Sequence, residues 1–225
     1  MRSRFMSKAG SSSFGDGNGL IRFGAACLCA AFLIGCATSG DRPERAASAL
    51  EQAPASASAL ARYAEGVAAL EAGHVARATA TFETLAREYP QYSGPLRQLA
   101  WLAVDAGDNA QAFDYLHRAL KVCEACASVL TDLGVLHRQR GEFDAAEQAY
   151  RDALAADRDY APAHFNLAVL FELYRMRPRP AIDHYERYLA LEEDDPDARL
   201  IRAWVADLER QAASLTSTAH IETRP

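Results

Sequence analysis

Among the motifs of this sequence, a pair of cysteines three positions apart has the spacing most typical of redox chemistry or metal binding. A thioredoxin-like role for Cys123 and Cys126 would need a strand before the motif and a helix behind it, and neither pattern is present. A zinc site would need two further ligands, for which His117 and His137 are candidates. In an oxidising compartment the same pair forms a short disulfide loop. We expect a disulfide or two unused thiols, and a redox or metal protein that uses this pair is the alternative.

Other polar residues show no catalytic arrangement. The acidic run from Glu192 to Asp197 lacks the glycine and the spaced glutamate of a calcium-binding loop. It precedes an expected helix, where acidic residues complement the helix dipole. No partnered nucleophile or metal-binding histidine pair accompanies the remaining histidines, which are His74, His164, His184 and His220. We therefore expect no enzyme activity, no metal site and no cofactor.

A further cysteine, Cys36, closes an apolar run near the N-terminus. The run, residues 23–34, is too short to span a membrane and is typical of an export signal. Four cations precede it: Arg2, Arg4, Lys8 and Arg22. The sequence Leu-Ile-Gly-Cys at 33–36 resembles a bacterial lipobox, in which the cysteine is lipidated and becomes the first residue of the mature protein. The alternatives are an ordinary secretory signal and a short buried helix.

The lipobox resemblance implies a signal peptide at 1–35 and a lipid anchor on Cys36. Because Ala37 is not an aspartate, the rule for such lipoproteins places the anchor in the outer membrane, with the domain in the periplasm. Acyl chains contribute about 0.8 kcal/mol per buried methylene, so the anchor needs no transmembrane helix. Residues 36–58 are rich in alanine, serine and proline, and we expect them to be a flexible tether with a span of roughly 25 Å.

The chain is acidic. It has 24 lysines and arginines against 30 aspartates and glutamates, a formal charge of −6. Loss of residues 1–35 removes four cations and Asp16, which changes the charge to −9. Lys121 is then the sole lysine. This composition argues against nucleic acid as a partner.

A period of 34 residues runs through the rest of the chain. Within each copy, apolar residues recur every three or four positions on both sides of a glycine, which predicts two short amphipathic helices joined by a turn. Four sets of similar residues lie 34 positions apart: Gly73, Gly107 and Gly141; Ala78, Ala112 and Ala146; Phe82, Leu116 and Tyr150; and Gly66, Ala100, Gly134 and Ala168. Two helices of this length cannot bury their apolar faces alone, so the copies must stack.

This pattern resembles the tetratricopeptide repeat from about Ala59 to Leu191. The resemblance implies an all-α, right-handed superhelical solenoid of about four helix hairpins whose concave face holds a protein partner. We expect the copies at 59–92, 93–126, 127–160 and 161–195. A capping helix at 196–212 and a disordered tail at 213–225 should follow. The apolar stripe of the capping helix is Leu200, Ile201, Trp204, Val205 and Leu208.

The fourth copy departs from the pattern at its turn. Residues from Arg175 to Pro180 stand where earlier copies have a glycine, and one inserted residue restores the register of the next helix. The three arginines of this turn, Arg175, Arg177 and Arg179, are a candidate site for docking an acidic partner. A solvated variant turn is the alternative.

In the family, certain positions of the first helix tend to face the concave groove. Exposed aromatic and arginine side chains there would anchor a partner. The matching residues are Tyr63, Arg97, Trp101, Thr131, Arg138, Phe165 and Glu172. For Trp101 and Phe165 the alternative is a place in the core between repeats.

In layout, the chain is similar to the repeat lipoproteins that assist assembly of a pilus or a secretion pore. The resemblance implies a non-enzymatic scaffold that binds and positions another envelope protein. An adaptor that delivers substrates to periplasmic proteases or cell-wall enzymes is the alternative among binding proteins.

Overall fold

The computed structural model describes residues 56–222, with side-chain placement up to Ser214. This part of the chain forms nine helices and no strand. The helices are α3 (Ala57–Glu71), α4 (Val75–Glu88), α5 (Gly94–Asp105), α6 (Asn109–Val122), α7 (Ala127–Gln139), α8 (Phe143–Ala156), α9 (Ala161–Leu173), α10 (Pro178–Leu191) and α11 (Ala198–Glu222). The predicted signal peptide, Cys36 and all but the end of the tether lie outside the described residues.

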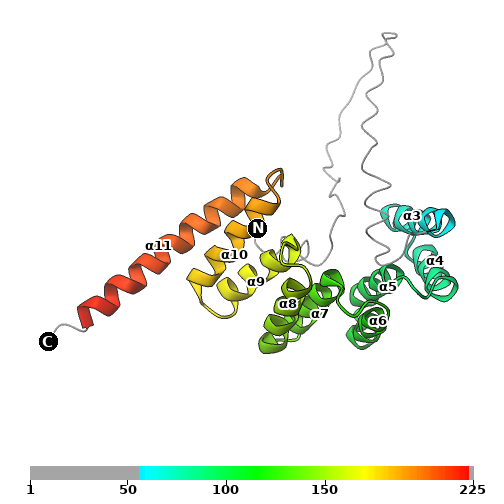
Figure 1. Cartoon of the computed structure of the whole chain (residues 1–225), viewed down its shortest axis with the longest axis horizontal. Coiled ribbons are helices and arrows are strands. Elements are labelled where there is room, and N and C mark those ends of the chain that lie inside the picture. Colours follow the sequence, from blue (N-terminus) through cyan, green and yellow to red (C-terminus); the bar gives the residue numbers. More distant parts are fainter. Residues whose placement is uncertain (1–55, 223–225) are drawn as a thin grey trace, which may run out of the picture.

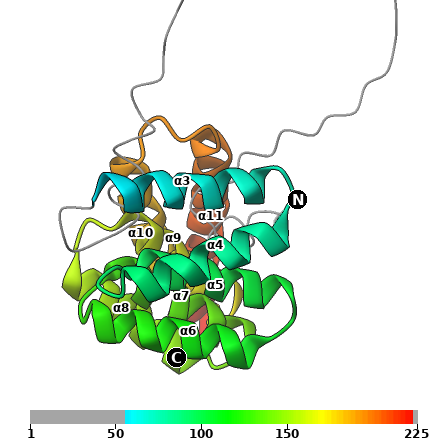
Figure 2. The same ribbon diagram turned by 90° about the vertical axis from the view of Figure 1, so that its right-hand side faces the viewer.

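Helices α3 to α10 form four antiparallel hairpins, and each hairpin packs on the next one along the chain. Figure 1 shows the stack running from α3 at one end to α11 at the other, and Figure 2 looks along it from the α3 end. One cluster of buried apolar residues extends from α3 to α8 and a second from α7 to α11. The prediction of an all-α helical repeat is therefore confirmed.

The first three turns have the same backbone structure because each needs a residue in the left-handed region. Gly73, Gly107 and Gly141 have φ angles of 74°, 79° and 77°. After each glycine, a backbone N–H donates to the carbonyl five residues earlier, as from His74 to Ala69 at 2.8 Å. Glycine adopts this conformation without steric cost, which explains why the glycines recur with the repeat.

The fourth turn also needs a residue in the left-handed region, but it contains no glycine. Met176 takes the left-handed conformation, with φ 51°. The N–H of Arg177 donates to the carbonyl of Phe171 at 2.8 Å, which is six residues earlier rather than five. The inserted residue is absorbed here, so Ala181 and Tyr185 of α10 are buried.

A small residue faces a large one inside the hairpins. A Cβ atom added to Gly66 would lie 2.7 Å from the ring of Phe82, and one added to Gly134 would collide with the ring of Tyr150. The second copy has the buried residues Ala100 and Leu116 at the corresponding positions. An aromatic side chain on the second helix thus requires glycine on the first in these two hairpins, because the backbones are too close for a methyl group.

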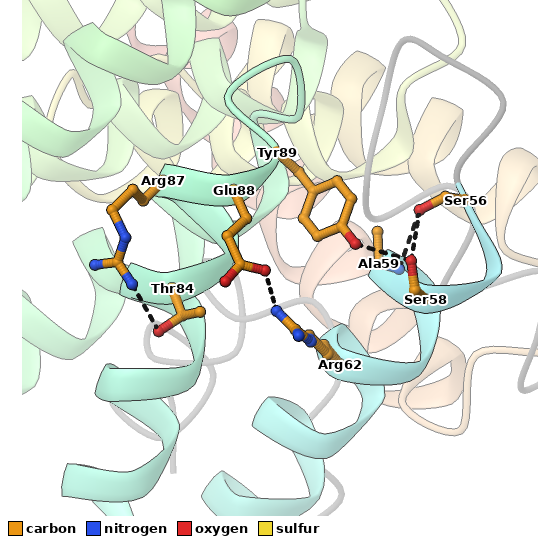
Figure 3. Close-up of polar contacts among 8 residues, drawn as sticks. All are labelled: Ser56, Ser58, Ala59, Arg62, Thr84, Arg87, Glu88 and Tyr89. Atoms are coloured by element: carbon orange, nitrogen blue, oxygen red, sulfur yellow. Dashed lines mark hydrogen bonds and ion pairs between the residues drawn. The ribbon is translucent and has the colours of Figure 1, made fainter.

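Polar contacts close the first hairpin where the described chain begins (Figure 3). The side-chain oxygen of Ser56 caps α3 by accepting a backbone N–H at 3.2 Å. The hydroxyls of Ser58 and Tyr89 lie 2.8 Å apart, and Arg62 forms an ion pair with Glu88. The last two contacts join α3 to the end of α4, in a hairpin that has one neighbouring hairpin among the described residues.

Helix α11 covers the last hairpin. Its buried side chains pack against α10, and the rings of Trp204 and Tyr185 lie 6.1 Å apart. The buried residues of the predicted stripe are Ile201, Trp204, Val205 and Leu208. Leu200 is 38% exposed, so its inclusion in the stripe was wrong.

Helix α11 is longer than predicted. We expected it to end near Ala212 and a disordered tail to follow, but the helix continues to Glu222. No glycine or proline occurs between Ala213 and Glu222, so nothing in the backbone ends the helix earlier. The second half of α11 extends beyond the α9–α10 hairpin (Figure 1).

Gly134→Ala should lower the free energy of unfolding by about 1–3 kcal/mol, because the new methyl group forces the buried ring of Tyr150 to move. Urea unfolding followed by circular dichroism measures this. The double variant Gly134→Ala, Tyr150→Leu reproduces the Ala100 and Leu116 pair of the second copy. It should be more stable than the sum of the two single effects predicts, and additive effects would contradict the proposed contact.

Candidate functional site

The seven residues predicted to face the groove all lie on the first helix of a hairpin. Tyr63 is on α3, and the others follow on α5, α7 and α9. Successive copies place Tyr63, Arg97, Thr131 and Phe165 at one repeat position, and Arg138 and Glu172 at another. The structure therefore brings the seven positions to equivalent faces of adjoining hairpins, and it gives them different environments.

Two of the seven hold neighbouring hairpins together. Gln98 Nε2 donates a hydrogen bond of 2.7 Å to the hydroxyl of Tyr63, and Arg97 Nε donates one of 2.7 Å to the carboxylate of Asp132. Each bond joins residues 35 positions apart and so connects one copy to the next. Asp132 is buried, so loss of Arg97 would leave a buried charge without this partner.

Arg138 is buried and connects three helices. Its side chain is in α7, Nε donates to the hydroxyl of Tyr150 in α8 at 3.3 Å, and Nη2 donates to Asn166 Oδ1 in α9 at 3.4 Å. The guanidinium also lies 5.9 Å from the ring centre of Tyr174. Burial raises the pKa of Tyr150 to about 12, although the charge of Arg138 has the opposite effect. Arg138 therefore contacts its own chain instead of presenting its charge to solvent.

The remaining residues of the C-terminal half are also engaged. Thr131 is buried and donates to the carbonyl of Ala127 at 2.7 Å. Phe165 is buried against Tyr185 and Tyr188, with ring centres 5.8 and 5.1 Å away, so the core alternative describes it. The carboxylate of Glu172 accepts a hydrogen bond of 2.8 Å from the Tyr185 hydroxyl.

Trp101 remains half-buried, and it has partly exposed apolar neighbours in the repeat pattern. We call Val67 and Leu70 of α3, with Trp101 and Val104 of α5, the α3–α5 apolar strip. Val67 and Trp101 occupy one repeat position, and Leu70 and Val104 another. Of these four residues, the sequence analysis predicted Trp101 alone. The repeat could have indicated the others, because Val67 lies one repeat before Trp101, and Val104 and Leu70 lie one and two repeats before Arg138.

The strip does not continue into the later hairpins. Val135 and Val169 follow Trp101 in the repeat, and both are buried. At these two repeat positions, the apolar side chains that remain accessible to solvent are therefore those of the first two hairpins.

The three arginines of the fourth turn do not act as one group. Arg175 forms ion pairs with Asp144 and, at 3.6 Å, with Glu147, both on α8. Arg177 lies over the ring of Phe171, 5.1 Å from its centre, and Arg179 is exposed. Within 56–222 no carboxylate forms an ion pair with Arg177 or Arg179. Arg175 thus fixes the turn, and the other two arginines are available.

Cys123 and Cys126 form a disulfide between α6 and α7, and both are buried. The histidines considered as zinc ligands have other contacts. His117 is exposed with Nδ1 2.7 Å from the Phe113 carbonyl, and His137 Nδ1 lies 2.6 Å from a carboxylate oxygen of Glu142. From Ser56 to Glu222, no group of three or more potential ligands is arranged to hold a metal ion.

A histidine pair that sequence reasoning missed joins α9 and α10. The Nδ1 atoms of His164 and His184 lie 2.9 Å apart, and His164 Nε2 is 3.0 Å from the carbonyl of Arg158. Because Nε2 of His164 must donate to that carbonyl, its Nδ1 accepts and Nδ1 of His184 donates. Burial, and then the proximity of His164, lower the pKa of His184 to about 4. The two residues are 20 positions apart, so no local motif reveals them.

None of the helices between Ala57 and Glu222 is sufficiently long and apolar to span a membrane.

Stacked helix hairpins with a half-buried apolar strip on one face define a helical-repeat scaffold. The family model for the tetratricopeptide repeat matches residues 39–93, 97–161 and 131–173, which together are more than half of the chain. The chain therefore belongs to the tetratricopeptide repeat family.

Solved structures show the same fold. PilF from Pseudomonas aeruginosa is similar with a TM-score of 0.60 and 21% identity, over 69% of each chain. A thermophilic tetratricopeptide repeat protein from Thermus thermophilus has a TM-score of 0.57 and 26% identity, over 73% of this chain and 86% of the other. A repeat protein from Parabacteroides merdae has a TM-score of 0.53 and 17% identity, over 69% and 62% of the two chains.

One curated relative is an enzyme, the probable UDP-N-acetylglucosamine–peptide N-acetylglucosaminyltransferase SPINDLY of Hordeum vulgare. It is 38% identical over 69 residues, which are 31% of this chain and 7% of that protein. The chain thus spans a small fraction of the length of this relative.

The histidine pair should make stability depend on pH. The pKa of His184 is about 4 when folded and about 6.5 when unfolded, so below pH 6.5 the unfolded state binds more protons. This contribution to stability is complete above about pH 6.5 and falls as the pH decreases toward 4. Urea midpoints at both ends of this range should differ less in His184→Gln than in the wild type. His74→Gln, at an exposed position, is the control, and an equal change in both variants would contradict the assignment.

Proposed function

We propose that this chain is a non-enzymatic scaffold that binds a segment of another cell-envelope protein along the α3–α5 apolar strip and positions it. Repeat proteins of this family are protein–protein interaction scaffolds, and the chain has their fold. The observation that carries the proposal is the half-buried Trp101 on a strip of four apolar side chains in the first two hairpins. The residues that follow Trp101 in the repeat, in the later hairpins, are buried in the core.

The strip suits a partner because its side chains can still lose solvent-exposed area. Tryptophan is enriched among the residues that dominate binding energy at interfaces. Trp101 is partly buried, and covering about 50 Å² more of its ring would contribute about 1.3 kcal/mol to binding. The backbone beneath it is fixed by the hydrogen bonds from Gln98 to Tyr63 and from Arg97 to Asp132, so binding requires little ordering of the scaffold.

Among envelope proteins, we favour a component of a pilus or of a secretion complex as the partner. The support is the similarity of fold to PilF, together with the N-terminal sequence pattern of an exported lipoprotein. A redox function for Cys123 and Cys126 has no such support, because the pair is joined in a buried disulfide.

The location belongs to the same proposal. A basic N-terminus, an apolar run and the sequence Leu-Ile-Gly-Cys support export and lipidation of Cys36. Ala37 supports an anchor in the outer membrane, with the repeat domain in the periplasm.

Trp101→Ala should reduce capture of partner proteins about tenfold or more, because it removes the largest side chain of the strip. Crosslinking in cells followed by detergent purification measures the yield. Val75→Ala is the matched control, since Val75 is an exposed apolar residue on α4, outside the strip. Equal recovery of the same partners by Trp101→Ala and the wild type would show that the strip is not the binding site.

Cys36→Ser should abolish acylation and leave an unprocessed or soluble protein, because serine lacks the thiol that carries the lipid. Membrane fractionation and metabolic labelling with a palmitate analogue measure the two effects. Unchanged fractionation of the variant would rule out a lipid anchor on Cys36.

A further inference from the structure

The fourth turn holds an apolar side chain in solvent. Met176 has a φ of 51°, which is unfavourable for a residue with a side chain, while the other three turns use glycine. Its side chain is 79% exposed, the highest value among the large apolar residues described. Glycine would relieve the backbone strain and remove the exposed apolar surface. A strained residue that gains no packing in return is typical of a functional position.

The turn is fixed from both sides. Arg175 ties it to α8 through ion pairs with Asp144 and Glu147. On the other side, the N–H of Arg177 donates to the carbonyl of Phe171, and its guanidinium covers the Phe171 ring. Two prolines follow within the next three residues. A rigid turn of this kind loses little conformational entropy on binding.

The charge of the turn differs from that of the chain and of the other turns. Arg177 and Arg179 are exposed beside Met176, and neither forms an ion pair with a carboxylate of the described residues. In the other turns the glycine is followed by His74, Asp108 or Glu142. The whole chain carries a formal charge of −6, so Arg177 and Arg179 are two exposed cations outside the ion pairs of the described residues on an acidic protein.

We propose that Met176, Arg177 and Arg179 form a second binding surface, separate from the α3–α5 apolar strip, for an acidic segment of a protein. Met176 enters an apolar pocket of the partner, and the two guanidinium groups pair with carboxylates around it. A protein suits this surface better than a membrane does, because one methionine adds few buried methylenes and even a full myristoyl chain gives marginal membrane binding.

Two short synthetic peptides test the proposal with the full chain by fluorescence anisotropy. One is rich in aspartate and leucine, and the other has every aspartate replaced by asparagine. The wild type should bind the aspartate peptide about tenfold more tightly, and Arg177→Gln, Arg179→Gln should remove this preference. The control Arg199→Gln, Arg202→Gln makes the same charge change at exposed positions of α11 and should keep it.

Met176→Gly separates binding from folding because its two effects have opposite signs. It should weaken peptide binding severalfold and raise the midpoint of thermal unfolding by about 2–4 °C through relief of backbone strain. Unchanged affinity in this variant, or equal losses in the two arginine double variants, would overturn the proposal. The proposal would also be overturned if the wild type did not bind the aspartate peptide but bound vesicles of phosphatidylcholine and phosphatidylglycerol in a way that required Arg177 and Arg179.

Discussion

The structure depends on the fact that a hairpin of two short helices cannot bury its apolar faces by itself. Each hairpin closes internally where a small residue meets a large one, as Gly134 meets Tyr150, and its outer surfaces need neighbours. α7 contributes to both large core clusters and so connects the two halves of the stack. The ends need other solutions, which are polar bonds around Ser56 at one end and α11 at the other.

Stacking of the hairpins uses side chains at positions that were predicted to face a partner. Positions that could present side chains to a partner also lie where adjoining hairpins meet, and in the C-terminal half the chain uses them for itself. Arg138 joins α7 to α8 and α9, and Phe165 fills the core. At the positions equivalent to Arg138 the first two hairpins have Leu70 and Val104, and at those equivalent to Val135 they have Val67 and Trp101, so partly exposed apolar side chains remain in these hairpins.

The sequence was sufficient to predict features set by backbone geometry. Left-handed turns and close helix contacts tolerate few residue types, so glycine recurs at the position of Gly141 and glycine or alanine at that of Gly134, which reveals the hairpins and their order. Features set by side-chain contacts between distant residues were not predictable. The burial of Arg138 depends on helix rotation, and the pairing of His164 with His184 depends on how α9 meets α10. The exposed Met176 was missed because the arginines beside it were the stronger signal.

The hydrogen bonds between copies have a consequence for folding fidelity. Repeat proteins misassemble when a copy packs on the wrong neighbour. Here the first two interfaces have different pairs, a tyrosine with a glutamine between the first and second hairpins and an arginine with an aspartate between the second and third. A hairpin that skipped its proper neighbour would place Asp132 beside Tyr63 and bury its carboxylate away from Arg97, which costs about 3–5 kcal/mol for a buried ion pair that loses one partner. The different pairs therefore favour the observed order of these copies over packing on the wrong neighbour.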